Sequence, residues 1–104
     1  MAERHLVPLR LVTIVGEAVL EHRLVDTVLG AGATGYTLLH AVGEGSRDAR
    51  SSHRTSENVR LESVVDEPTA ERILEELADH YFEHYAVIAY VTTVDVVRGD
   101  RYTR

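Results

Sequence analysis

The spacing of hydrophobic residues alternates between two periods along this chain, and the alternation limits the folds that the chain can adopt. Strand-like runs rich in Val, Leu and Ile occupy residues 6–15, 36–42, 58–65 and 86–97. Apolar residues recur at three and four positions, as in a helix, over residues 17–30 and 68–81. The predicted order is strand, helix, strand, strand, helix, strand, which is typical of the α+β, ferredoxin-like fold. We therefore expect a four-stranded antiparallel sheet with both helices on one face.

The helix predicted at 68–81 has the clearest pattern. Pro68 follows Asp66 and Glu67 and suits the first turn of a helix. The apolar positions that follow form one stripe: Ala70, Ile73, Leu74, Leu77, Ala78 and Tyr81. Polar residues occupy most of the remaining positions, so we expect this helix to pack on the sheet with its other face in solvent.

The last predicted strand is apolar on both of its faces. Val87, Ala89 and Val91 alternate along it with Ile88 and Tyr90. Two helices can cover one face of a four-stranded sheet, and the other face then needs a different cover. We predict that further copies of the chain supply this cover, so the protein should be a homo-oligomer.

Composition bounds the domain organisation and excludes several classes of protein. The 104 residues, 44% of them hydrophobic, suffice for one domain with its own core. The formal net charge of -6 argues against a nucleic-acid-binding protein, because such affinity depends on neutralising phosphates. The absence of Cys excludes disulfides and thiolate metal sites. Neither a signal peptide nor a membrane span is evident, so we expect a cytoplasmic protein that is not inserted in the membrane.

The segment between the second and third predicted strands differs in charge from the rest of the chain. Residues 43–60 carry four Arg against Glu44, Asp48 and Glu57, a balance of +1, whereas the remaining 86 residues balance at -7. Every basic residue is an Arg, whose planar guanidinium suits phosphate oxygens. Glycines at 43 and 45 would let backbone N–H groups approach an anion, although glycines in such loops also serve simply to form turns. We infer a candidate phosphate site in this segment.

The same region takes part in a family resemblance. The turn Gly35-Tyr36-Thr37, the stretch from Gly43 to Ser52, Tyr81-Phe82 and the run from Tyr85 to Tyr90 resemble the PII signal-transduction superfamily. The likeness is to the PII-like branch typified by the SbtB regulators of bicarbonate uptake, and it covers nearly the whole chain. It implies that residues 1–104 form a single PII-like domain with a long flexible effector loop at about 43–57. It also implies a homotrimer that binds adenine nucleotides in clefts between neighbouring subunits.

The resemblance implies a role for each part of the cleft. The side that holds the base and the ribose would be lined by Gly35, Tyr36 and Thr37. The phosphates would meet Gly43, Gly45, Ser46, Arg47 and Arg50. The pocket would be closed beside the base by the backbone of Val87, Ile88 and Ala89. The loop would signal to a partner such as a bicarbonate transporter or another protein of carbon metabolism.

Two departures from the family pattern bear on the length of the phosphate tail. Glu44 places a carboxylate in the glycine loop, where it would repel phosphate oxygens unless an Arg or a metal intervened. The chain also lacks the Gly-Lys segment with which better-known PII proteins clamp phosphates before the last strand. AMP and cyclic AMP are therefore as reasonable as ADP and ATP, with the nucleotide acting as a regulatory ligand rather than a cofactor.

A second interpretation is a small ferredoxin-like enzyme or metal-binding protein. His80 and His84 are four residues apart, as metal ligands on a helix can be, and Asp79 and Glu83 lie beside them. However, the turn expected before Tyr85 would end the helix, and no third ligand stands at a recognisable spacing. Nucleophile-elbow and Walker motifs are absent as well. We therefore expect no catalytic residues and no metal site, and we favour the nucleotide sensor.

Overall fold

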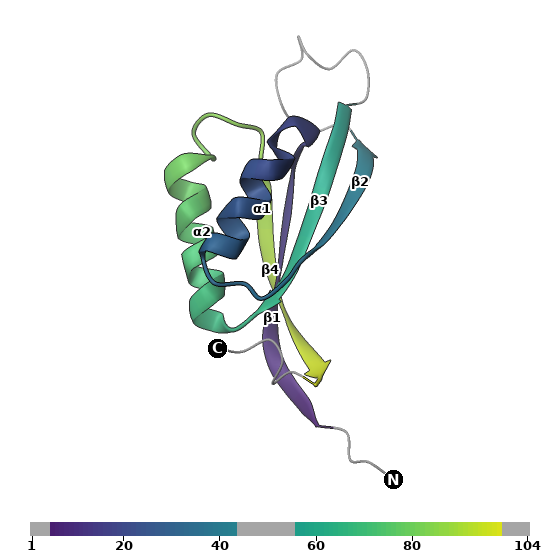
Figure 1. Cartoon of the computed structure of the whole chain (residues 1–104), viewed down its shortest axis with the longest axis vertical. Coiled ribbons are helices and arrows are strands. Elements are labelled where there is room, and N and C mark those ends of the chain that lie inside the picture. Colours follow the sequence, from purple (N-terminus) through teal and green to yellow (C-terminus); the bar gives the residue numbers. More distant parts are fainter. Residues whose placement is uncertain (1–4, 44–55, 99–104) are drawn as a thin grey trace.

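The computed structural model describes residues 5–43 and 56–98, and the predicted alternation of strands and helices is found within them. Four strands form one sheet: β1 (Leu6–Glu17), β2 (Thr37–Gly43), β3 (Ser56–Val65) and β4 (Ile88–Val97). The connections contain a 3₁₀ turn, η1 (Ala18–Leu20), and two helices, α1 (Glu21–Gly30) and α2 (Glu67–His80). Both helices cover the same face of the sheet (Figure 1).

The strand order across the sheet is β2-β3-β1-β4, and every pair of neighbours is antiparallel. Thr13 in β1 illustrates the register, because it lies opposite Glu62 of β3 on one side and Tyr90 of β4 on the other. β1 and β3 are central, whereas β2 and β4 form the edges. This order confirms the predicted ferredoxin-like fold.

The hydrophobic core lies between the sheet and the helices. Its most deeply buried apolar side chains, each at most 1% exposed, come from the two central strands and both helices: Val12, Ile14, Val59, Leu61, Val65, Leu24, Val28, Ile73 and Leu77. Successive side chains of a strand point to opposite faces, so every second residue of β1 and β3 enters this core. The predicted stripe on α2 is confirmed at Ile73 and Leu77, and Tyr81 just beyond the helix is also buried.

Capping structures fix the end of α1 and the start of α2. Beyond α1, Gly32 has a φ of 117°, a backbone conformation that residues with a Cβ rarely adopt. The N–H of Ala33 then donates to the carbonyl of Val28, which completes a Schellman motif. At the start of α2, the Asp66 carboxylate accepts a 3.0 Å hydrogen bond from the Thr69 N–H. Among the described residues, no helix is long and apolar enough to cross a membrane.

Several element boundaries differ by a few residues from the sequence-based expectation, and two of these differences have a clear cause. The sequence predicts a helix from residue 17, but β1 continues through Glu17 because this residue still pairs with Asn58 of β3. Regular α-helix begins at Glu21, after the 3₁₀ turn. The last strand begins at Ile88 rather than at residue 86, because residues 86 and 87 belong to the turn that leaves α2.

The face of the sheet opposite the helices, here called the open face, is formed by alternate residues of all four strands, among them Leu39, Glu62, Thr13, Ile88 and Tyr90. Leu39, Ile88 and Tyr90 are 49%, 60% and 46% exposed. Their neighbours along the strands point toward the helices, so the sheet is apolar on both sides, as the sequence predicts.

Candidate functional site

The first candidate segment, Gly35 to Thr37, lies at an edge of the sheet where the connection from α1 enters β2. Ser63 of β3 holds it, because the Ser63 hydroxyl donates a 2.7 Å hydrogen bond to the carbonyl of Gly35. Ser63 is 3% exposed, so this bond is largely shielded from competing water. An inner strand therefore fixes the backbone of the segment.

A cavity of about 300 Å³ opens beside this segment. It is lined by Leu11, Gly35, Tyr36, Thr37, Glu62, Ser63 and Val64. The structure thus brings the three predicted residues together, and it adds residues from β1 and β3 that the sequence interpretation did not select. The sequence did contain a signal for these added residues of β3. The alternation of residues 58–65 places Glu62 and Val64 on the opposite face of the strand from the core residue Leu61.

The chemistry of the cavity suits a flat group that carries hydrogen-bond donors. The ring of Tyr36 is half exposed and available for stacking. A Cβ placed on Gly35 would meet nothing within 4 Å, so packing does not require a glycine there. Because glycine has no side chain, a ligand has room beside the backbone at this position. The Glu62 carboxylate can accept bonds from hydroxyl or amino groups, whereas it would repel a phosphate.

An ion pair on β3 sets the charge next to the cavity. Arg60 Nη2 lies 3.0 Å from Glu62 Oε2, with the Arg60 side chain 46% exposed and that of Glu62 25% exposed. Partly exposed pairs of this kind contribute little to stability. Glu62 therefore keeps a charge-balancing neighbour while its carboxylate remains accessible from the cavity.

The second candidate segment begins at Gly43, the last residue of β2, which pairs with Ser56 of β3. The other predicted phosphate contacts, Gly45, Ser46, Arg47 and Arg50, lie outside the described residues. Gly43 stands six residues beyond Thr37, or about 20 Å along an extended strand. Contact of residues 45–50 with a ligand in the cavity therefore requires that they fold back toward the sheet.

The third candidate segment, Val87 to Ala89, lies at the start of β4 on the opposite edge of the sheet. Ile88 belongs to the same row as Leu39 of β2, with Val15 and Arg60 between them. Three strand spacings separate these edges by about 14 Å. One chain therefore does not bring the third segment onto the cavity.

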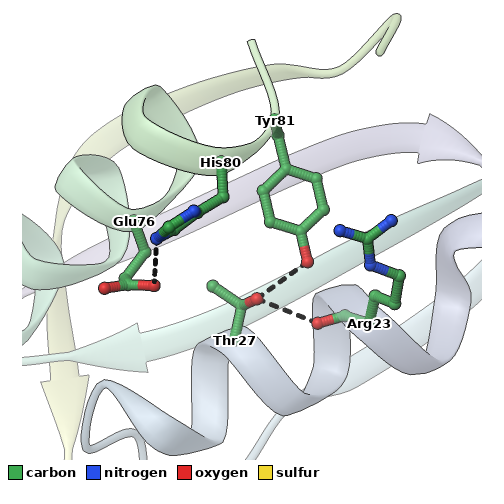
Figure 2. Close-up of polar contacts among 5 residues, drawn as sticks. All are labelled: Arg23, Thr27, Glu76, His80 and Tyr81. Atoms are coloured by element: carbon green, nitrogen blue, oxygen red, sulfur yellow. Dashed lines mark hydrogen bonds and ion pairs between the residues drawn. The ribbon is translucent and has the colours of Figure 1, made fainter. Parts of the chain in front are cut away.

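The residues of the metal-binding alternative do not converge. Helix α2 ends at His80, one residue earlier than predicted, and His84 lies in the turn that follows, as expected. His80 faces Glu76 at 3.6 Å, as Figure 2 shows, while His84 lies 3.8 Å from Glu83. In the described ranges 5–43 and 56–98, no group of three or more His, Asp or Glu side chains could hold a metal ion.

A polar cluster that the sequence interpretation missed joins α1 to the turn after α2. Tyr81 and Thr27 bring their hydroxyl oxygens to 2.8 Å, and Thr27 also donates to the carbonyl of Arg23 at 2.9 Å (Figure 2). Arg23 itself donates to the Tyr85 hydroxyl at 2.8 Å. This hydrogen bond raises the pKa of Arg23 above its ordinary value, so the guanidinium stays charged at any physiological pH. We call Arg23, Thr27, Tyr81 and Tyr85 the Arg23 cluster.

Comparison with known families gives a match over most of the chain. A family model described as Nitrogen regulatory protein P-II matches residues 9–101. The matched range includes all of β2, β3 and β4, both helices and the segment between β2 and β3.

Solved structures agree with this match. A protein described as a PII-like signaling protein from Thermus thermophilus is 57% identical, covers 94% of this chain and 98% of its own, and gives a TM-score of 0.81. CPII from Thiomonas intermedia, a nitrogen regulatory PII-like protein solved with ADP, AMP and bicarbonate, is 25% identical and gives 0.75 over 88% of this chain and 94% of its own. CPII solved with ADP, AMP and acetate shares the fold at 21% identity, with a TM-score of 0.82 over 95% of this chain and 98% of its own.

Proposed function

The chain belongs to the nitrogen regulatory protein P-II family, and from that premise we propose that it is a cytoplasmic regulatory protein that binds an adenine nucleotide between the subunits of a homotrimer. Members of this family are regulators, so we assign the protein no catalytic activity. Residues 1–104 would act as one domain whose loop at about 43–57 carries the signal to a partner.

The cavity at Gly35 to Thr37 is the observation that carries the proposal. It offers a half-exposed aromatic ring, open backbone at Gly35 and the carboxylate of Glu62 within one space of about 300 Å³. These groups suit an adenine ring and the ribose hydroxyls, with Glu62 accepting a hydrogen bond from a hydroxyl.

The separation of the candidate segments supports a site between subunits. Within one chain, Val87 to Ala89 lie on the far edge of the sheet from Gly35 to Thr37. The open face provides an apolar surface through which copies can associate, and a neighbouring copy would then bring its own Val87, Ile88 and Ala89 to the cavity.

The phosphates would extend from the cavity toward the loop, away from Glu62. There Gly43, Gly45 and Ser46 would offer backbone N–H groups, and Arg47 and Arg50 would bind phosphate oxygens through their guanidinium forks. Folding of the loop onto the phosphates would change the surface that it offers to a partner. CPII was solved with ADP, AMP and bicarbonate, which supports a link to carbon supply and a partner such as a bicarbonate transporter.

Isothermal titration of the trimer with AMP, cyclic AMP, ADP and ATP, each with and without bicarbonate, tests the proposal. We expect micromolar binding of at least one nucleotide, lost in Arg47→Ala and retained in Arg54→Ala, the matched control in the same loop. Protease cleavage within residues 43–57 should slow when the nucleotide is added. A verified trimer that binds none of the four nucleotides refutes the proposal.

A further inference from the structure

The turn between α2 and β4 leads directly into Val87, Ile88 and Ala89, the segment that the proposed function assigns to the cleft. Much of this turn is exposed, including Phe82 at 45% and Tyr85 at 37%. An exposed turn makes few core contacts that would hold it in place. The position of Val87 to Ala89 therefore depends on specific contacts at the two ends and in the middle of the turn.

The two ends of the turn are anchored on elements of the core. Tyr81 is 3% exposed, and its hydroxyl meets that of Thr27 in α1 at 2.8 Å (Figure 2). At the other end, Val87 is 8% exposed and packs against Gly16 of β1. The approach is close, because a Cβ on Gly16 would lie 3.2 Å from Val87 Cγ2.

Arg23 of α1 holds the middle of the turn. Its guanidinium donates a 2.8 Å hydrogen bond to the Tyr85 hydroxyl, and it lies 5.3 and 5.2 Å from the ring centroids of Tyr81 and Tyr85. Both distances are within the range of cation–π attraction. The Tyr85 N–H also donates to the carbonyl of Tyr81, and the Val87 N–H donates to the carbonyl of Tyr85. A movement of Tyr85 is therefore passed directly to Val87.

We propose that Arg23 is a positioning residue for the nucleotide cleft, which acts through Tyr85 to fix the start of β4 and does not itself touch the ligand. This inference rests on the proposed function and extends it to a residue on the helical layer, on the other side of the sheet from the open face. Without the Arg23 contacts the turn samples more conformations. Each binding event must then order it again, which lowers the affinity without removing any contact to the nucleotide.

The test is a titration of the full-length trimer with AMP and ADP. Arg23→Met should weaken binding about five- to tenfold, the effect expected from one hydrogen bond together with an exposed cation–π contact. Tyr85→Phe keeps the ring and loses only the hydrogen bond, so it should weaken binding about two- to fivefold. Arg23→Lys, which keeps the charge but loses the planar fork, should fall between wild type and Arg23→Met. Arg10→Met is the matched control, because it removes an arginine whose 3.5 Å ion pair with Glu67 lies away from the turn. It should bind as wild type does.

Two readouts separate positioning from a general loss of stability. The double variant Arg23→Met/Tyr85→Phe should have the same affinity for nucleotide as the single variant that binds more weakly. The reason is that both changes break the same contact between Arg23 and Tyr85. Amide hydrogen exchange at Val87 to Ala89 should accelerate in the Arg23 and Tyr85 variants, while that of β1 and β3 stays as in wild type.

The outcomes distinguish this inference from the proposed function. If wild type binds the nucleotide and the Arg23 and Tyr85 variants bind it equally well, the positioning role is overturned and the proposed function stands. The same follows if Arg10→Met loses as much affinity as those variants do. Fully additive losses in the double variant overturn the action through Tyr85. Absence of nucleotide binding by wild type overturns the proposed function and this inference with it. Should Arg23→Met fail to fold, Tyr85→Phe and Arg23→Lys decide the question.

Discussion

The two faces of the sheet are built from the same strands and yet differ sharply in one chain. Beneath the helices, Val12, Ile14 and Leu61 are at most 1% exposed, whereas Leu39 and Tyr90 on the open face are 49% and 46% exposed. The chain completes the first face with its own helices and leaves the second for another surface. Neighbouring residues of one strand therefore have different functions, since one stabilises the fold and the next is available to stabilise an assembly.

Truncation of a core residue should have the largest effect on the covered face. Leu61→Ala removes a fully buried side chain, so we expect the free energy of unfolding to fall by about 2 to 5 kcal/mol. Urea denaturation followed by circular dichroism measures this, with the exposed Val42→Ala as the control at about 0.5 kcal/mol or less. Similar losses in the two variants would contradict the assignment of the core.

A charge on the open face should break the assembly and leave the fold intact. Tyr90→Glu should raise the dissociation constant of the trimer about 30-fold or more, because it buries an unpaired carboxylate between copies. Sedimentation velocity should show smaller species, and nucleotide binding should decrease with them. Val42→Glu, which points away from the open face at the β2 edge, should remain trimeric. Trimers of Tyr90→Glu at low concentration would show that the open face is not the interface.

Ser63 links the two faces, because it is buried on the helix side and its hydroxyl bonds the backbone beside the cavity. Ser63→Ala should lower the free energy of unfolding by about 1 kcal/mol and weaken nucleotide binding about threefold. Thermal unfolding and titration measure the two effects, with the exposed Thr34→Ala in the same connection as the control. A loss of stability without a change in affinity would show that nucleotide binding does not depend on this hydrogen bond.

The smallest effect is expected at the rim of the covered face. Glu21 at the start of α1 lies 3.4 Å from His40 of β2, and their side chains are 36% and 66% exposed. Glu21→Gln should change the free energy of unfolding by less than about 0.5 kcal/mol, because solvent and salt screen such pairs. Denaturation in low and high salt measures this change. A loss in the free energy of unfolding of more than about 1 kcal/mol would contradict the assignment of the pair as a weak surface contact.

The fold was predictable because its signals are local. The helical stripe on residues 68–81 and the Asp66–Pro68 start specify α2 within a few residues, and the apolar alternation specifies the strands. The resemblance to PII proteins is likewise confirmed by the family match. The start of α1 was placed too early, because pairing of Glu17 with Asn58 depends on a strand that is distant in the sequence.

The candidate site was predictable only in part. Gly35, Tyr36 and Thr37 do line a cavity, but Glu62 was missed because alternation gives the face of a residue and not its neighbours across the sheet. The Arg23 cluster joins residues 62 positions apart in sequence, a contact that only the packing of α1 against the turn creates. The roles of the loop arginines stay predictions, since they lie outside the described residues.

The pairing of Gly43 with Ser56 means that β2 and β3 remain joined up to the base of the segment between them. A segment with a closed base can change in length or sequence at little expense, because doubling a loop adds only about 0.6 kcal/mol of closure entropy. Evolution, or an engineer, could therefore exchange residues 51–55 for a different recognition sequence while the sheet, the cavity and the proposed phosphate contacts as far as Arg50 stay as they are. The part of this segment beyond Arg50 could thus change the surface offered to a partner without altering the residues proposed to bind the nucleotide.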